Sequence, residues 1–199
     1  KYEAIGELLG VSVGAIKGTS KVGVAFSELM EKVGSETAAN YMVAGGSVTS
    51  AALAGGKYVV LSLSSAVNAA PSVTVQNAKD LAGNSVAQTT GSGQLSDLVT
   101  STDVGDIGVD PVVPGYAAAF ASGAYLVAGG GHDIWDAADG FHFVYKEFTG
   151  PLDAKVRVEW ISSMSGLSHS STWAKTELMV RESTAAGSRH VSICTTRTD

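Results

Sequence analysis

Apolar and polar residues alternate in short runs along most of the chain. Residues 21–26 (KVGVAF) and 72–76 (SVTVQ) place apolar side chains at every second position, as a strand with one buried face requires. Residues 58–64 (YVVLSLS) predict another strand, and further short runs that predict strands lie at residues 11–16, 41–43, 47–53, 124–127, 173–182 and 189–195. Because the runs recur about every 8–12 residues with turn signals between them, the pattern predicts an all-β fold of the sandwich type.

The most regular alternation covers residues 152–161 (LDAKVRVEWI). Its apolar positions are expected to face a core, and Trp160 is the largest of them. Residues 141–145 (FHFVY) predict another strand, whose core face would carry its three aromatic side chains, Phe141, Phe143 and Tyr145.

Periodicity is lost at residues 89–106, where Gly, Ser, Thr and Asp dominate. This is the composition of a linker, so two all-β domains are expected, at residues 1–88 and 107–199. Residues 1–16, which are mostly apolar, would enter the first domain as a strand or be donated to another chain.

Two segments of the first domain carry a family resemblance. Residues 22–32 (VGVAFSELMEK) and 73–86 (VTVQNAKDLAGNSV) contain the motifs FSE and KDLAGN. In this respect residues 11–88 resemble the bacterial Ig-like domains of surface-layer and large secreted proteins. The resemblance implies an Ig-like β-sandwich that serves as a spacer or scaffold without catalysis.

The second domain contains the most distinctive stretch of the chain, a glycine run followed by acids and alternating aromatics. Residues 129–158 (GGGHDIWDAADGFHFVYKEFTGPLDAKVRV), together with WAKTELMVRES at 173–183, are similar to a concanavalin A-like jelly-roll family. Members of this family are called enolase-regulator-like or glucanase-like. The resemblance covers about residues 105–199 and implies a jelly roll that is incomplete, because the sequence stops one strand after WAKTELMVRES. Either the sequence is a fragment, or strands from another chain complete the sheet.

Charge and composition exclude several classes of partner. The net charge is −6 and no Lys or Arg cluster is present, so neither nucleic-acid binding nor a polybasic membrane patch is expected. No apolar run approaches the roughly 20 residues needed to span a bilayer, so membrane insertion is not expected. A charged fraction of only 16% with 24 glycines is typical of extracellular β-rich proteins. Cys194 is the single cysteine and is expected to be a buried small hydrophobe.

Three acids in the glycine-rich stretch are candidate metal ligands. Carboxylate oxygens on a loop suit calcium, and Asp133, Asp136 and Asp139 are spaced three residues apart. The alternative is turn chemistry, because Asp favours turns and bonds its own backbone. No other cofactor is indicated.

Aromatic residues near these acids are candidate ligand contacts. Trp135 lies in the same loop beside His132, and Trp173 begins the WAK motif. Exposed tryptophans stack on sugars, so these three residues are the predicted ligand-binding set.

Catalysis has little support in the sequence. Asp136 with Glu177, or Glu159 with Glu177, could in principle serve glycoside hydrolysis, but the E-x-D-x-x-E pattern of concanavalin-like glucanases is absent. A Ser-His-Asp site lacks the G-x-S-x-G elbow, and no zinc-binding histidine spacing occurs.

The sequence therefore predicts a non-catalytic extracellular or cell-surface protein with a structural or adhesive role. Its expected partners are other copies of itself or other surface proteins, joined by strand complementation in a filament or lattice. The alternative is a glycan-binding accessory module or a piece of a secreted carbohydrate-active enzyme.

Overall fold

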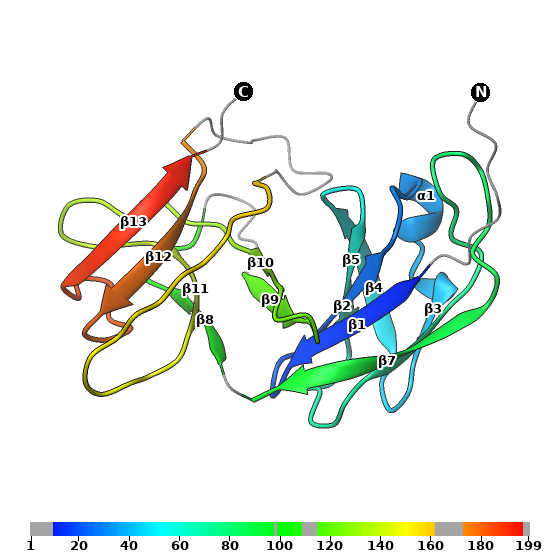
Figure 1. The fold of residues 1–199 in the computed structure, drawn as a ribbon, viewed down its shortest axis with the longest axis horizontal. Helices are drawn as coiled ribbons and strands as arrows, with labels where there is room; N and C mark the ends of the chain where they lie inside the picture. Colours follow the sequence, from blue (N-terminus) through cyan, green and yellow to red (C-terminus); the bar gives the residue numbers. More distant parts are fainter. Residues whose placement is uncertain (1–9, 98, 109–114, 162–172, 197–199) are drawn as a thin grey trace. The chain divides into compact units, whose positions relative to one another are not determined.

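The computed structural model describes residues 10–97, 99–108, 115–161 and 173–196 and is almost entirely β (Figure 1). The exceptions are one α-helix, α1 (Lys32–Ser35), and one 3-10 helix, η1 (Ala38–Asn40). The prediction of an all-β fold is confirmed. The chain divides into two compact units: unit 1 is Lys1–Asp97 with Ala117–Leu126, and unit 2 is Leu98–Tyr116 with Val127–Asp199.

Unit 1 is built on a seven-stranded sheet with the order β3-β6-β7-β1-β2-β5-β4, nearly closed into a barrel. Its strands are β1 (Val11–Ile16), β2 (Lys21–Phe26), β3 (Tyr41–Val43), β4 (Val48–Ala54), β5 (Tyr58–Leu63), β6 (Ser72–Val75) and β7 (Thr89–Ser96). Neighbouring strands are antiparallel except β1 and β7, which are parallel. All six strands expected before residue 89 are present, and Gly55 and Gly56 form the β4–β5 turn with positive φ.

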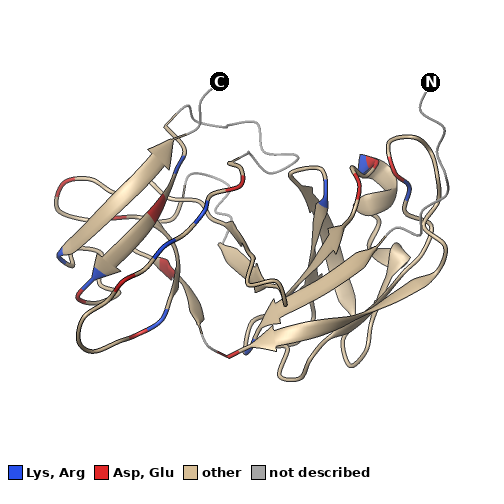
Figure 2. Ribbon diagram, viewed as in Figure 1, with Lys and Arg blue, Asp and Glu red and all other residues tan. Residues whose placement is uncertain are grey.

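The apolar side chains of these strands form the core of unit 1. Val13 pairs with Val24, and Ala15 with Val22, and all four side chains are at most 1% exposed. Lys21 is the one charged residue in the seven strands, and Figure 2 shows the other charges of unit 1 on its connections. Each fully buried valine contributes about 1.5–3 kcal/mol, so burial of these strands is the main source of stability.

The prediction of a linker at residues 89–106 is corrected by the structure. It contains two strands, β7 and β8 (Thr100–Val104), and β7 is a central strand of unit 1. A Cβ on Gly93 would lie 2.8 Å from Val13 Cγ1 and 2.7 Å from the Pro71 carbonyl oxygen. Glycine and small residues therefore let β7 approach its neighbours closely, and this composition is also the one typical of flexible connections.

The strand at 11–16 belongs to its own sheet rather than to another chain. β1 lies between β2 and β7, so the alternative of a donated strand is wrong for these residues. Residues 1–9 of the expected entering segment lie outside the described residues.

A later segment also belongs to unit 1, although the sequence assigned it to the second domain. Gly14 and Gly23 are directly paired across β1 and β2, and a Cβ on Gly14 would lie 2.0 Å from the Ala119 carbonyl oxygen. A Cβ on Gly23 would lie 2.6 Å from Ala118 Cβ. Because neither glycine has a side chain, this part of the sheet is flat, and residues 117–120 pack on it. These four residues are buried.

Unit 2 consists of short pairs of strands. β8 pairs with β11 (Phe141–Tyr145), and β12 (Lys175–Arg181) pairs with β13 (His190–Thr196), both antiparallel. The hairpin of β9 (Tyr116–Ala119) and β10 (Tyr125–Ala128) is divided between the two units. The strands expected at 141–145, 173–182 and 189–195 are thus present.

The aromatic side chains of β11 lie on one face, as expected, but they are only half-buried. The ring of Phe143 lies 5.5 Å from that of Phe141 and 5.1 Å from that of Tyr145, between centroids. They form an aromatic row rather than part of a closed core.

The strand expected at residues 152–161 is wrong. These residues belong to no sheet, and Val156, Val158 and Trp160 are 64%, 40% and 39% exposed. Alternation makes a segment able to form a strand, but a strand exists only where another backbone pairs with it. In the part of the chain that the structure describes, no helix is long and apolar enough to cross a bilayer.

Candidate functional site

The loop at residues 129–140 lies along one face of β12. The strand register places the side chains of Lys175, Glu177, Met179 and Arg181 on this inner face. Lys175 Nζ is 2.7 Å from Asp133 Oδ1, and Arg181 Nη1 is 3.2 Å from Asp139 Oδ2. The two ends of the loop are therefore fastened to the two ends of the strand.

The ion pair between Asp139 and Arg181 is the buried anchor of this arrangement. The two side chains are 5% and 2% exposed. The Arg181 guanidinium also donates to the Ala185 carbonyl oxygen at 2.7 Å and lies 5.1 Å from the centroid of the Phe141 ring. His190 Nδ1 lies 3.5 Å from Asp139 Oδ2. Breaking such a buried pair leaves an uncompensated charge, which makes the anchor costly to remove.

The pair between Asp133 and Lys175 is more open to solvent. The Asp133 side chain is 51% exposed and that of Lys175 is 24% exposed. The hydrogen bond from Lys175, with that from the Ile134 N–H, holds the pKa of Asp133 below its usual range. The Asp133 carboxylate in turn raises the pKa of Lys175.

The three acids predicted to bind calcium are not brought together. Asp133 and Asp139 are fastened to different cations of β12, and Asp136 occupies an exposed turn with φ +60°. Within residues 10–97, 99–108, 115–161 and 173–196, no group of three His, Cys, Asp or Glu side chains is placed to hold a metal ion. A calcium site at these acids stays a prediction of the sequence.

The residues predicted to contact a ligand do lie in one region. Trp135 follows Asp133 by two positions, Trp173 precedes Lys175 by two, and the ion pair joins these segments. Trp135 is 73% exposed and Trp173 is 78% exposed. His132 is exposed in the same loop, and its backbone N–H donates to the Asp106 carbonyl oxygen at 3.3 Å. The sequence could not supply the ion pair that connects them.

The acids considered for glycoside hydrolysis occupy different surroundings. Asp136 is at the loop tip, Glu159 pairs with Arg157 in the exposed segment 151–161, and Glu177 is on the inner face of β12. No contact between any two of these acids is seen in the described parts. Glu177 Oε2 is buried and accepts no hydrogen bond from a described residue.

A Ser-His-Asp hydrogen-bond chain is present, although no Ser-His-Asp site is expected from the sequence. His142 Nε2 is 2.8 Å from Ser101 Oγ, and His142 Nδ1 is 2.6 Å from Asp103 Oδ1. The Asp103 carboxylate also accepts from the Gly115 N–H at 3.0 Å. The signal is cross-strand register, because β8 places Ser101 and Asp103 on the face that β11 shares. Spacing along the chain does not contain this register.

This chain of hydrogen bonds satisfies a buried imidazole. The His142 side chain is 3% exposed. A Cβ on Gly115 would lie 2.1 Å from His142 Cγ, and one on Gly129 would lie 2.4 Å from His142 Cβ. Two glycine backbones therefore enclose the residue, and its polar atoms tie β8, β11 and Gly115 together.

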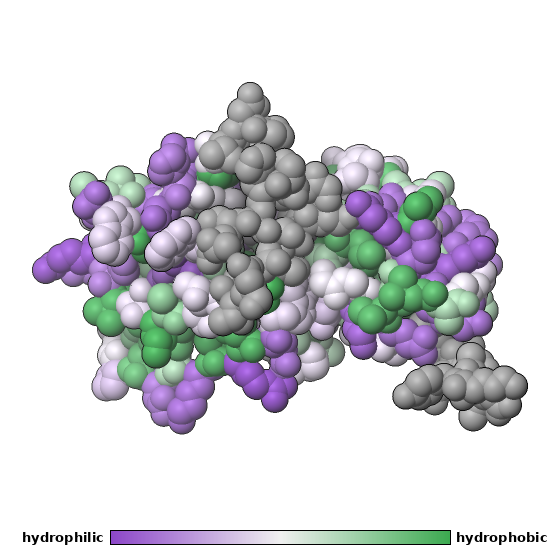
Figure 3. Space-filling view, turned by 90° about the horizontal axis from the view of Figure 1, so that it is seen from above, coloured by the Kyte–Doolittle hydropathy of each residue, from purple (hydrophilic) through white to green (hydrophobic). Residues whose placement is uncertain are grey.

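The outer face of the β12–β13 hairpin is apolar and open. Val180, Val191 and Ile193 on this face are 43%, 77% and 73% exposed. A groove of about 350 Å³ lies between this face and the extended segment that contains Val156 and Val158. Figure 3 shows hydrophobic residues at the surface of the part that holds unit 2, among polar ones.

β13 itself is exposed along its whole length. All seven of its residues are exposed, and in Figure 1 it has β12 on one side and no other strand on the other. Cys194 is among the exposed residues, so the expectation that it is buried is wrong.

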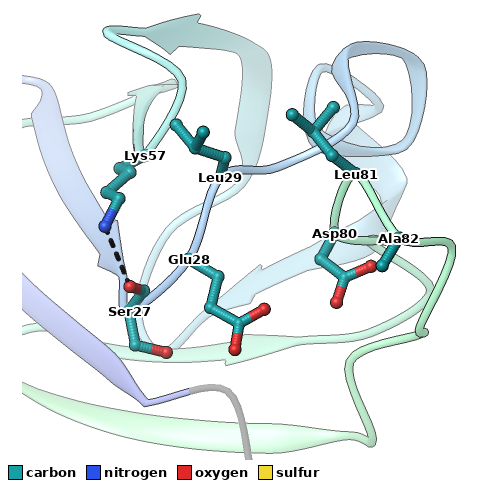
Figure 4. A pocket seen from close by; sticks show the side chains of 7 residues that line it. All are labelled: Ser27, Glu28, Leu29, Lys57, Asp80, Leu81 and Ala82. Carbon is teal, nitrogen blue, oxygen red and sulfur yellow. Dashed lines mark hydrogen bonds between the residues drawn. The ribbon is translucent and has the colours of Figure 1, made fainter. Parts of the chain in front are cut away.

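In unit 1 the two motifs of the first resemblance lie side by side. The Leu81 N–H donates to the Leu29 carbonyl oxygen at 3.0 Å, and Asp80 Oδ1 and Oδ2 accept from Asn84 at 2.8 Å each. These bonds hold the pKa of Asp80 below its usual range. The segments border a depression of about 470 Å³ (Figure 4), lined by Ser27, Glu28, Leu29, Lys57, Asp80, Leu81 and Ala82. Here side-chain and backbone bonds close one end of the sheet.

No protein family and no curated protein matches the chain. Among solved structures, surface layer protein SbsC, domains 1–6, is similar over 61% of this chain and 19% of that chain, at 18% identity and TM-score 0.42. The N-terminal part of the bacterial S-layer protein SbsC is similar over 67% and 36%, at 17% identity and TM-score 0.41. The S-layer protein rSbsC(31-844) is similar over 61% and 19%, at 20% identity and TM-score 0.37. The chain thus spans between 19% and 36% of the length of these chains.

Proposed function

We propose that this protein is a non-catalytic structural and adhesion module of the extracellular or cell surface, and that it associates with other copies of itself through the free edge of β13. The observation that carries the proposal is the state of this strand. It is seven residues long, exposed throughout and paired on one edge within the described part of the chain. An edge of this kind presents a row of backbone donors and acceptors to another strand.

β13 lacks the devices by which proteins usually protect an edge. Its sequence, HVSICTT, contains no Lys, Arg, Asp, Glu or Pro. Its pairing with β12 runs without a bulge from Arg181 opposite His190 to Lys175 opposite Thr196. Charged residues, proline and bulges are what deter edge-to-edge pairing, so β13 is suited to accept a further strand.

A second copy of β13 is the occupant that fits best. Antiparallel pairing about Ile193 places Val191 of each copy opposite Thr195 of the other, with no like charges facing each other. The result is a two-fold contact in which two hairpins form one four-stranded sheet. Their outer faces would then join into one apolar surface that carries Val180, Val191 and Ile193 twice.

Unit 1 would serve as the rigid spacer of this module, and we assign it to the Ig-like sandwiches. Its order separates into β1-β2-β5-β4 and β3-β6-β7, which is the ABED and CFG arrangement of constant-type domains. Unit 2 would be related to the concanavalin A-like jelly rolls. Support for that assignment is limited to β11 and β12, which fall on the FHFVY and WAKTELMVRES motifs.

Sedimentation velocity over a range of protein concentrations tests the association. We expect the wild type to form dimers or larger species, and Val191→Lys and Ile193→Lys each to give a monomer. In Ile193→Lys the new charge faces its own copy across the two-fold axis, and in Val191→Lys it lies on the edge opposite Thr195 of the other copy, where a charge deters strand pairing. Val33→Lys is the matched control, since Val33 is 74% exposed on α1 in unit 1. A wild type that is monomeric at every concentration, or lysine variants that still associate, would contradict the proposal.

A further inference from the structure

The sheet of unit 1 also has end strands, and one of them is long. These strands are β3 and β4, which contact each other but are not paired, so each has one paired neighbour within the described residues. β3 has three residues, whereas β4 has seven, and the β4 sequence VTSAALA contains no charge and no proline. By its sequence alone, β4 is therefore as suited to edge-to-edge pairing as β13 is.

Unlike β13, β4 is irregular at its N-terminal end. Its register with β5 shifts between Val48 and Ser50, which leaves Thr49 without a paired residue on β5. The Thr49 hydroxyl donates to the Ser62 carbonyl oxygen at 3.1 Å. A bulge interrupts the row of backbone donors and acceptors, so this end of β4 is a poor template for another strand.

At the C-terminal end of β4, a side chain takes the place of a neighbouring strand. The Leu53 N–H donates to Glu36 Oε1 at 3.1 Å. Glu36 belongs to no strand, so this N–H points away from β5 and toward the open edge. A carboxylate is a stronger acceptor than a backbone carbonyl group, because the hydrogen bond is charge-assisted. Between the bulge and this bond, only residues 50–52 remain for a further strand.

The fold holds Glu36 in this position. Glu36 is the C-cap of α1, and its N–H donates to the Lys32 carbonyl oxygen at 2.9 Å. The buried hydroxyl group of Tyr41 donates to the Ser35 carbonyl oxygen at 2.8 Å and so ties the helix to β3. The Glu36 side chain is 25% exposed, and both α1 and η1 contact β4. The carboxylate is therefore fixed beside β4 by the elements around it.

We propose that Glu36 is an autoinhibitory contact, which occupies the edge of β4 and prevents β4 from pairing with β4 of a second copy. Without the carboxylate, the Leu53 N–H has no acceptor, and a backbone donor in that state favours any strand that supplies one. Antiparallel pairing about Ala51 would place Thr49 of each copy opposite Leu53 of the other, with no charges facing each other. This inference goes beyond the association proposed for β13 and does not depend on it.

Sedimentation velocity over a range of protein concentrations tests the inference in the Ile193→Lys background, where a lysine deters pairing through β13. We expect Glu36→Ala and Glu36→Asp to shift from monomer to dimer as the concentration rises. Glu36→Gln should stay monomeric, because its amide oxygen can still accept from the Leu53 N–H. Lys32→Ala is the matched control, since it removes the 3.9 Å ion pair with Glu36 and leaves the acceptor in place. Circular dichroism verifies that each variant is folded, and Glu36→Asp decides the test if Glu36→Ala does not fold.

A further substitution identifies the strand that pairs. Ser50 is exposed on β4, so Ser50→Lys should return the Glu36→Ala variant to the monomer. The inference is overturned if the folded alanine and aspartate variants associate no more than their background does. It is also overturned if Glu36→Gln associates equally, or if Ser50→Lys leaves the association unchanged. Association of the Ile193→Lys background itself would contradict the β13 proposal alone, because the inference on Glu36 is judged by differences within that background.

Discussion

The sheet of unit 1 and the hairpin of unit 2 use similar strand sequences in opposite ways. β5 of unit 1 (YVVLSL) buries Val59, Val60 and Leu61 to 2% exposure or less. β13 of unit 2 (HVSICTT) leaves Val191 and Ile193 more than 70% exposed. The difference lies in what covers the strands: β5 is paired on both edges and its side chains pack in the core of unit 1, whereas β13 is paired on one edge and its side chains are exposed. The comparison teaches that an apolar strand with one free edge is a surface available for association, whereas the same pattern in a closed sheet is core.

Unit 2 has its own source of order in charged contacts. Asp139 lies within a buried network with Arg181 and His190, and Asp139→Ala is expected to lower the free energy of unfolding by about 3–5 kcal/mol. The exposed pair of Glu182 and Arg189 is the control, and Glu182→Ala should cost about 1 kcal/mol or less. All three tryptophans lie in unit 2, so urea unfolding followed by tryptophan fluorescence reports on this unit. If Asp139→Ala and Glu182→Ala lower the free energy of unfolding equally, the Asp139 contacts stabilise unit 2 no more than an exposed ion pair does.

Equal truncations in the two strands test the comparison directly. Leu61→Ala should destabilise unit 1 by about 2–5 kcal/mol, because the residue is fully buried. Ile193→Ala should change the free energy of unfolding of unit 2 by about 0.5 kcal/mol or less in the monomer. Hydrogen exchange measured by mass spectrometry at low protein concentration follows both units separately. A large cost at Ile193 in the monomer would mean that β13 is covered by its own chain.

Substitution of the buried His142 should have an intermediate effect on the free energy of unfolding. His142→Phe leaves Asp103 and Ser101 without their shared partner and should cost about 1–3 kcal/mol, measured by urea unfolding. Ser101→Ala removes only one of these hydrogen bonds and should cost about 1 kcal/mol. If labelling with a fluorophosphonate modifies Ser101, the interpretation of the Ser101–His142–Asp103 hydrogen bonds as purely structural is wrong.

The smallest expected effect is a response to acid. The pKa of Asp133 is lowered in the folded protein, so its contribution to stability is complete above the unfolded value of about 4 and is lost as the pH falls through the folded value. Tryptophan emission should therefore be constant from neutral pH down to about pH 5 and change below pH 4. Asp133→Asn is the control and should remove this acid transition, while a change centred near pH 6 would point to a histidine instead.

The sequence was informative where apolar side chains recur at every second position of a run. Residues 21–26 and 58–64 contain this pattern, and both form strands of the sheet that pair with each other. Residues 89–96 were missed because their pairing depends on close packing by glycine, which resembles linker composition. Residues 152–161 were overestimated, since alternation contains no information on whether a second backbone is present.

The candidate site was predictable only in its parts. Trp135, Trp173 and Asp133 were recognisable as residue types that bind ligands, but Lys175 as the residue connecting them was not. The tertiary fold also determines the contacts of two other residues. Asp139 forms a buried ion pair, and His142 forms hydrogen bonds with Ser101 and Asp103 of the neighbouring strand. Contacts that join residues about 40 positions apart are fixed by the fold and leave no periodic trace in the sequence.

The central claim is that the open edge of β13 joins copies of this protein, and the sedimentation of the wild type beside Ile193→Lys and Val33→Lys tests it most directly. The account predicts that wild type and Val33→Lys associate with rising concentration while Ile193→Lys sediments as a folded monomer. Three proteins that all sediment as monomers, or an Ile193→Lys variant that associates like the wild type, would contradict it.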